Sequence, residues 1–124
     1  MEQKFYRCEI CGNIITHLKD SGIRVVCCGQ EMTELLAGSV DASLEKHVPV
    51  ITQDAGKVVV SVGSIAHPMT PEHYIEWICL VKKDGCEVKY LAPGSEPQAE
   101  FALTGTDAIV GVYEYCNLLG LWKA

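Results

Sequence analysis

Four cysteines in the first 36 residues constrain this chain more than any other feature. Two residues lie between Cys8 and Cys11, and fifteen more lie between Cys11 and the adjacent pair Cys27-Cys28. So short a segment cannot bury enough apolar surface to fold without a staple. A Cys-x-x-Cys turn directs two sulfurs at one ion, and a cage of four thiolates suits iron or zinc. We therefore predict a metal module, with a disulfide or inert thiols as the alternative. Because neighbouring side chains diverge, we expect the adjacent pair to distort the backbone.

The cysteine count and the bulk composition bound the class of protein. The chain holds seven cysteines, an odd number, and its start, MEQKFYRCEICGN, lacks the basic region and apolar core of a secretory signal. Metal ligands in a reducing compartment are favoured over a disulfide framework, so we expect a cytoplasmic protein. No run of about 18 uncharged apolar residues occurs, which argues against a membrane span. The formal net charge of −6 argues against nucleic acid and anionic membranes as partners.

The rest of the chain has the pattern of short strands. After a linker at 35–43, β-branched and aromatic residues gather in runs that Gly, Pro and Asp separate, and Asp84-Gly85 marks a hairpin. With no sustained helical period, this pattern predicts a mostly β chain: a four-cysteine module at 1–36 and an antiparallel β-sandwich at 37–124. The predicted strands are 57–65, 73–81, 86–92, 100–104 and 109–115, and TGTD at 104–107 is a predicted turn.

Histidines at the predicted loop–strand junctions form a second candidate site. His67 precedes Pro68, which favours an extended conformation. His73 is expected to open a strand and to share a face with Ile75, Trp77 and Cys79. Together with His47 and Cys116, these imidazoles are placed to converge on an ion at the rim of a sandwich, although each alone fits a partly buried strand residue.

Three further residues receive structural assignments. Cys79 and Cys86 flank the KKDG hairpin and are predicted to be small buried hydrophobic side chains. His17, in THLKDSG, is predicted to be a solvated turn residue of the first module.

Several segments resemble a known family. CEICG and VVCCGQEM are similar to desulforedoxin-type modules. EKHVPVI, HPMTPEHYIEWI and YCNLLGLWK resemble, in that order, the iron-site segments of the desulfoferrodoxins, the two-centre superoxide reductase family. The match runs over nearly the whole chain. It implies an N-terminal iron module with four cysteine ligands, followed by an immunoglobulin-like sandwich, and a homodimer.

The resemblance also implies ligands and roles. Iron would bind the imidazoles of His47, His67 and His73 in one plane and the sulfur of Cys116 axially. In the Glu-Lys-His pattern, Lys46 guides superoxide in, and Glu45 reaches the open position once the iron is ferric. The family's fourth imidazole comes from a histidine three residues after the cysteine, a position that holds leucine in this chain.

The implied activity is O2•− + e− + 2H+ → H2O2, with electrons from a small donor such as rubredoxin. The leucine at position 119 cannot bind a metal, so the implied centre has three histidines and one cysteine. We expect iron still to occupy it, with zinc as the substitute and a slower reductase as one consequence. The alternative function is an electron-transfer or structural metalloprotein with a compromised catalytic centre.

Overall fold

The computed structural model describes residues 2–103 and 109–124. It divides into two compact units, 1–36 and 37–124. Both are built from strands, which confirms the predicted mostly β class. The predicted turn at 104–107 and the last residue of the strand predicted at 100–104 lie outside the described residues.

The first unit is a small sheet with a separate hairpin. Strands β1 (Phe5–Arg7), β2 (Ile14–Thr16) and β5 (Thr33–Leu35) form a sheet in the order β2-β1-β5, while β3 (Val26–Cys27) pairs with β4 (Gln30–Glu31). In the described part of this unit only Phe5, Cys8 and Met32 are buried hydrophobic residues. The unit therefore lacks a core of its own, and an ion bound by its cysteines would supply the staple that its size requires.

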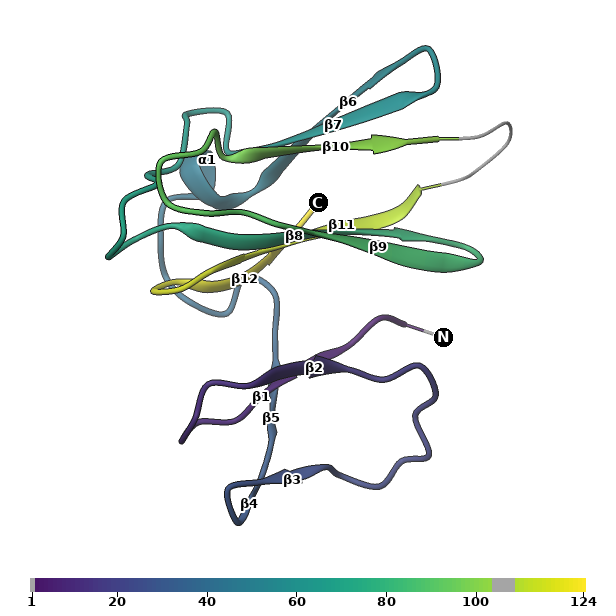
Figure 1. The fold of residues 1–124 in the computed structure, drawn as a ribbon, viewed down its shortest axis with the longest axis vertical. Coiled ribbons are helices and arrows are strands. Elements are labelled where there is room, and N and C mark those ends of the chain that lie inside the picture. Colours follow the sequence, from purple (N-terminus) through teal and green to yellow (C-terminus); the bar gives the residue numbers. More distant parts are fainter. Residues whose placement is uncertain (1, 104–108) are drawn as a thin grey trace. The chain divides into compact units, whose positions relative to one another are not determined.

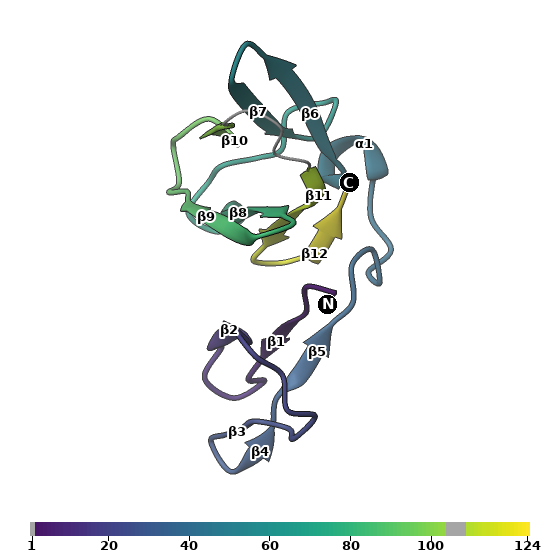
Figure 2. The same cartoon turned by 90° about the vertical axis from the view of Figure 1, so that its right-hand side faces the viewer.

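The second unit is a sandwich of two antiparallel sheets. One short helix, α1 (Leu44–His47), precedes them. The strands are β6 (Pro49–Asp54), β7 (Lys57–Val62), β8 (Ile75–Lys82), β9 (Gly85–Tyr90), β10 (Gln98–Ala102), β11 (Ile109–Cys116) and β12 (Gly120–Lys123). One sheet has the order β10-β7-β6 and the other the order β12-β11-β8-β9, and the two form the separate layers seen in Figures 1 and 2.

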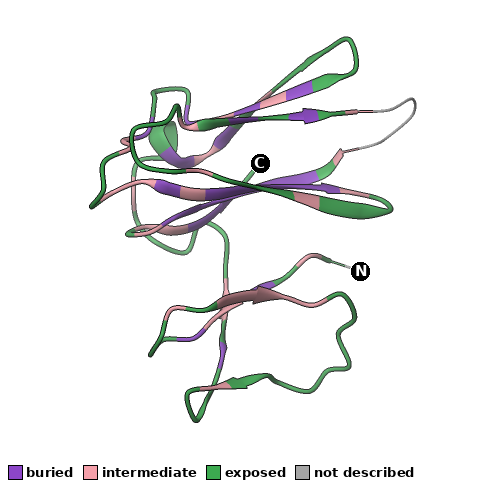
Figure 3. Ribbon diagram, viewed as in Figure 1, coloured by how far each residue is buried: buried purple, intermediate pink, exposed green. Residues whose placement is uncertain are grey.

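The core of the sandwich lies between its sheets. Strand β7 alternates in burial, so that every second residue turns inward. Figure 3 shows the buried residues concentrated in the central strands of this unit. The buried cluster comprises Val58, Val60, Val62, Ile75, Ile78, Leu80, Ala99, Phe101, Val112 and Cys116. Cys116 thus belongs to the core and is held in place by it.

The predicted strands agree with the observed ones to within three residues at each described end, and the hairpin is confirmed, because Lys82 pairs with Gly85 across a two-residue turn. The sequence analysis did not predict β6, β12 or α1. Strand β6 lies at the edge of its sheet and is largely exposed, so it lacks a strong apolar pattern.

One detail of β8 was predicted wrongly. The strand begins at Ile75, so His73 precedes it rather than opening it. Its register with β11 shifts at Glu76, because Ile75 pairs with Cys116 but Trp77 with Tyr115. This irregularity puts Ile75 into the core cluster, while Trp77 stacks on Tyr115 with ring centroids 5.7 Å apart. His73, Ile75 and Trp77 therefore do not share one face.

Within the described residues, no helix has the length and apolar character needed to cross a membrane.

Candidate metal centres

The four cysteines of the first unit lie on two tight turns. Cys8 and Cys11 belong to the turn between β1 and β2, whereas Cys27 ends β3 and Cys28 opens the turn between β3 and β4. Cys28 has φ 53°, the only positive φ at a non-glycine residue in the described part of the chain. That conformation costs a side chain about 1 kcal/mol. The predicted distortion at the adjacent pair is therefore confirmed.

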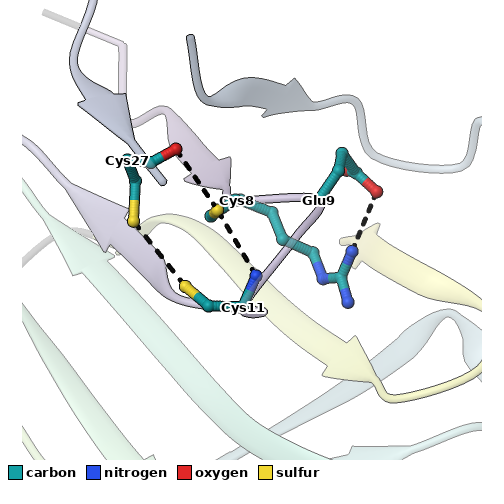
Figure 4. A network of polar contacts seen from close by, with 5 residues as sticks. Cys8, Glu9, Cys11 and Cys27 are labelled. Carbon is teal, nitrogen blue, oxygen red and sulfur yellow. Dashed lines mark hydrogen bonds and ion pairs between the residues drawn. The ribbon is translucent and has the colours of Figure 1, made fainter. Parts of the chain in front are cut away.

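The four sulfurs lie close enough together to surround one ion. All four are within 4.8 Å of one another, and the Cys11 and Cys27 sulfurs are 3.6 Å apart. A tetrahedral ion with metal–sulfur bonds of about 2.3 Å would separate its sulfurs by about 3.8 Å. The Cys11 backbone N–H donates to the Cys8 sulfur at 3.5 Å (Figure 4), and the Asn13 amide donates to the Cys27 sulfur at 3.7 Å.

Thiol acidity in this cluster is uneven. Backbone N–H groups of Cys11 and, to a smaller extent, Ile10 lower the pKa of Cys8 to about 6. Neighbouring cysteines, Cys11 first, raise the pKa of Cys27 and take that of Cys28 to about 12. Four thiolates this close repel one another unless a cation lies between them, so the donor set fits a bound metal ion.

The second cluster collects donors from remote parts of the sandwich. His47 is the last residue of α1, His67 and His73 lie in the connection from β7 to β8, and Cys116 ends β11. Their donor atoms all lie within 4.8 Å of one another. The rings of His47 and His67 meet edge to face at 4.8 Å, and those of His67 and His73 at 4.7 Å. The fold therefore brings together the residues that the sequence analysis singled out for this site.

Hydrogen bonds on one side of two rings leave the other side free to bind an ion. The Nδ1 atoms of His47 and His67 lie 2.7 Å from the carbonyl oxygens of Ser43 and Pro68 respectively. A carbonyl oxygen only accepts, so each Nδ1 carries the proton and each Nε2 has a lone pair.

The Nε2 atoms of all three histidines are buried and have no hydrogen-bond partner among the described residues. Leaving buried nitrogens unpaired is costly, and a metal ion would satisfy all three. The residues therefore fit a metal centre.

Burial also keeps the imidazoles of His67 and His73 in their metal-binding form. It lowers the pKa of His67 to about 4, assisted by the charges of His47, His73 and Lys46. The pKa of His73 is lowered by burial and by the charges of His47 and Lys46. A neutral imidazole is the form that binds a metal.

Cys116 supplies a buried sulfur to the cluster. Burial raises the pKa of its thiol, whereas backbone hydrogen bonds from Leu118 and Leu119 lower it. Two N–H donors thus face the sulfur and would stabilise a thiolate bound to a cation. The hydrogen bond from the backbone at position 119 is therefore present although the side chain is leucine.

Leu119 itself adds no ligand. Its side chain is partly buried against the core cluster, and its carbonyl accepts a hydrogen bond from Trp122 Nε1 at 3.0 Å. In the described residues the cluster contains only three histidines and one cysteine as candidate donors. The set is three nitrogens and one sulfur.

Asn117 connects the histidine loop to the cysteine strand, and the sequence analysis gave it no role. Its Oδ1 accepts from the Tyr74 backbone N–H at 2.9 Å, and its Nδ2 donates to the Glu72 carbonyl at 3.0 Å. Its own backbone N–H donates to the Tyr74 carbonyl at 3.2 Å. These bonds straddle His73 and fix it relative to Cys116. No spacing rule reveals such a residue.

Gly63 is a second residue that the sequence analysis missed. It has φ +81°, and a Cβ there would lie 2.6 Å from the Glu45 carbonyl oxygen and 2.7 Å from Lys46 Cα. Two residues after Gly63, the Ile65 N–H donates a hydrogen bond to the same Glu45 carbonyl at 3.0 Å. Only glycine allows this close approach. The turn therefore packs directly against the segment that ends in His47.

Glu45 and Lys46 occupy exposed positions on α1, beside His47. Lys46 lies near enough to the cluster for its charge to lower the pKa of His67 and His73, after the larger effect of burial. A positive side chain therefore stands at the rim of the candidate centre.

Glu114 is a further buried acid near this cluster. Both carboxylate oxygens lack a partner among the described residues, and burial raises the pKa of the side chain to about 9. The side chain is therefore neutral at physiological pH.

Two of the three structural assignments were wrong. His17 is half-buried, with its ring edge-on to Tyr6 at 5.2 Å, rather than a solvated turn residue. Cys79 is buried as predicted, but Cys86 is exposed because it lies on β9, the edge strand of its sheet.

Comparison with known proteins gives matches over both units. Residues 1–35 match the family model described as the desulfoferrodoxin N-terminal domain, and residues 39–124 match the desulfoferrodoxin model. The chain is 45% identical to the desulfoferrodoxin of Nitratidesulfovibrio vulgaris over 99% of its length and 96% of the relative's. It is 44% identical to that of Desulfarculus baarsii, covering 96% and 93% of the two chains. The superoxide reductase structure from Treponema pallidum superposes with a TM-score of 0.84 at 39% identity, covering 100% and 99%.

Proposed function

We propose, from the premise that the chain belongs to the desulfoferrodoxin family, that it reduces superoxide to hydrogen peroxide at an iron centre in the sandwich. The proposed ligands are His47, His67, His73 and Cys116. The observation that carries the proposal is the convergence of three buried, unpartnered Nε2 atoms on one sulfur.

Ferrous iron, when bound, would supply the single electron, which together with two protons converts superoxide to peroxide. The chain's residues set the electrostatics of that site. Imidazole binds a metal in its neutral form, so the three histidines would add no charge, while the Cys116 thiolate would neutralise one of the two positive charges. The loaded centre would therefore keep a net positive charge that attracts a small anion. The two backbone N–H groups at Cys116 moderate how much electron density its sulfur donates.

Lys46 is proposed to guide the substrate. The formal charge of −6 repels superoxide at long range, so attraction has to come from groups close to the site. Lys46 is exposed at the rim, and its charge is felt by His67 and His73. To Glu45, its exposed neighbour, we assign the role of binding at the open position after the product has left, in keeping with the Glu-Lys-His pattern.

The four-cysteine cluster is proposed to hold a second iron through Cys8, Cys11, Cys27 and Cys28. Cys11 and Cys28 are exposed, so a small donor such as rubredoxin could approach this centre closely. The centre either relays electrons or only holds the dimer together, and zinc substitution separates these two roles because a zinc-loaded cluster would keep only the second. All seven cysteines are free, in keeping with a reducing compartment such as the cytoplasm.

A homodimer is proposed through the first unit. Leu18 is 97% exposed and Ile23 is 76% exposed in a single chain. Apolar side chains in such numbers on so small a unit favour burial against a second copy. Light scattering on the purified protein would test this directly, with twice the chain mass as the expected result.

Leu119 favours a second candidate function. With four candidate ligands, the centre suits a tetrahedral ion such as zinc as well as iron. Zinc does not change its oxidation state, so a zinc-loaded sandwich would make the chain a structural or electron-transfer metalloprotein that relies on the four-cysteine iron alone.

Rapid mixing of ferrous protein with superoxide separates the two functions. The reductase should oxidise one sandwich iron per superoxide, and peroxide should form without oxygen. A metalloprotein of the second kind would leave the superoxide signal to decay at its uncatalysed rate.

A Leu119→His substitution gives a sharper prediction. An additional imidazole should raise iron affinity and the rate of superoxide consumption at least about tenfold, because it completes a coordination shell that is short of one ligand. Leu118→His is the matched control, since Leu118 is exposed in the same turn. Equal behaviour of the two variants would contradict the assignment of position 119.

A further inference from the structure

Two thiols that neither metal cluster uses lie together on the β8–β9 hairpin. Cys79 pairs with Val88, and Cys86 pairs with Val81. Directly opposed residues share a face, so the two cysteines are diagonal neighbours on one side of the sheet. The two thiols lie close enough for the charge and side-chain hydrogen bonding of Cys86 to raise the pKa of Cys79. Cys79 is buried and Cys86 is exposed, so an accessible thiol touches one that is shielded from solvent.

We propose that Cys79 and Cys86 form a redox-active dithiol, which hydrogen peroxide converts into a disulfide across the hairpin. The source of the oxidant rests on the proposed function, because peroxide would be the product released by the same molecule. The dithiol itself rests on the register of β8 and β9 and on the contact between the two side chains.

The reaction balances in two steps. The Cys86 sulfur attacks peroxide, so that an S–O bond forms, the O–O bond breaks and one water leaves; Cys86 becomes a sulfenic acid. The Cys79 sulfur then attacks the Cys86 sulfur, so that an S–S bond forms, the S–O bond breaks and a second water leaves with the Cys79 proton. Two thiols and one peroxide thus give one disulfide and two waters, and the dithiol loses two electrons.

The exposure of the two thiols sets the order of these steps. Cys86 meets peroxide first because it is accessible. Burial, followed by the charge and hydrogen bond of Cys86, raises the pKa of Cys79 to about 12. Cys79 is therefore protonated at neutral pH, and only a small fraction of it is the thiolate that the second step requires. The rate of closure should rise with pH as the Cys79 thiolate becomes more abundant.

The hairpin can accommodate the bond through a small movement of β9. Diagonal neighbours have Cα atoms about 7–8 Å apart, whereas a disulfide needs Cα atoms within about 7 Å. Strand β9 is an edge strand, and most of its side chains are exposed. It is bonded to a neighbour on one side only, so moving it towards β8 breaks few contacts.

The chain offers a direct test by peptide mapping. Lys82 and Lys83 lie between the two cysteines, so complete trypsin digestion separates peptide 58–82 from peptide 84–89. The metal-loaded protein is treated with a small molar excess of peroxide, blocked with iodoacetamide and digested without reductant. The expected result is one species in which 58–82 and 84–89 are joined, lighter by two hydrogen atoms than their sum, and separated again by reductant.

Two variants identify the steps. In Cys79→Ser, peroxide should leave a sulfenic acid on 84–89 that dimedone traps, with no joined peptide. In Cys86→Ser, Cys79 should remain alkylatable after denaturation. The proposal is overturned if peroxide leaves both native peptides unjoined, or if 84–89 is joined only to a second copy of itself.

The added peroxide makes this test independent of the reductase activity. If the pair closes with peroxide while superoxide consumption fails, only the proposed function is lost. If superoxide is consumed but the pair stays open, only the dithiol is lost.

Discussion

The two candidate metal clusters are built in opposite ways. The four cysteines come from two tight turns of a 36-residue unit whose only buried hydrophobic residues, among those described, are Phe5, Cys8 and Met32. The histidine–cysteine cluster draws its donors from positions between 47 and 116, on a sandwich that has a core of its own. A metal ion at the first cluster would therefore hold its unit together, whereas the second cluster is held in place by a fold with its own core.

The largest expected effect comes from removing both metals with a strong chelator. The first unit should lose its structure, because the binding free energy of a structural ion in so small a module is about 10–16 kcal/mol. The sandwich should stay folded. Amide NMR spectra check this: signals from 1–36 should collapse to random-coil positions, while those from 37–124 keep their dispersion. If the amide signals of both units collapsed together, the sandwich would also depend on its metal, and the contrast between the two clusters would be wrong.

A second prediction concerns His67→Ala. The variant should lose one metal per chain, with affinity at the sandwich falling at least about a hundredfold, because one of four donors is removed. Metal analysis and the absorption of the four-cysteine centre measure the two sites separately. His17→Ala is the matched control, since His17 lies outside both clusters. A loss of metal from the cysteine module in His67→Ala would show that the sites are not independent.

Gly63→Ala should destabilise the sandwich by about 3 kcal/mol. The substitution places a side chain at φ +81° and against the backbone of Glu45 and Lys46. Gly85→Ala should change stability by less than about 0.5 kcal/mol, because nothing lies within 4 Å of its added Cβ. Chemical denaturation of the metal-free sandwich measures both. Equal stability in the two variants would rule out the close approach at Gly63.

The smallest predicted effect concerns the two asparagines that support the clusters through hydrogen bonds, one at each site. Asn117→Ala removes the side-chain bonds to Tyr74 and Glu72, and should weaken metal binding at the sandwich about tenfold. Asn13→Ala removes the amide donor to the Cys27 sulfur and should act only on the four-cysteine site. Competition titrations with a chromophoric chelator give both affinities. If either variant weakened metal binding at the other site, the two sites would share supporting residues.

The first cluster could be predicted from the sequence because its geometry is local. A Cys-x-x-Cys turn and an adjacent pair have few ways to place four sulfurs, and even the strain at Cys28 follows from the adjacency of its neighbour. The second cluster was accessible only in part. Its residues stood out by type and by position near strand ends, but their convergence depends on pairings between β8 and β11 that no single segment encodes.

What sequence reasoning missed are the residues that act through the backbone. Asn117 works by hydrogen bonds to main-chain groups more than 40 positions away, and Gly63 by the space that it leaves empty. Neither leaves a pattern of spacing or charge. The irregularity at Glu76, which reverses the face of Ile75 relative to Trp77, is likewise invisible to a period-two rule.

Anomalous diffraction at the iron edge, on crystals of protein produced in iron-rich medium, tests the central claim most directly. We predict two peaks per chain. One should lie about 2.3 Å from four cysteine sulfurs, and the other about 2.1 Å from the Nε2 atoms of His47, His67 and His73 and about 2.3 Å from the sulfur of Cys116. A single peak in the four-cysteine module, with the three imidazoles turned apart, would contradict the account.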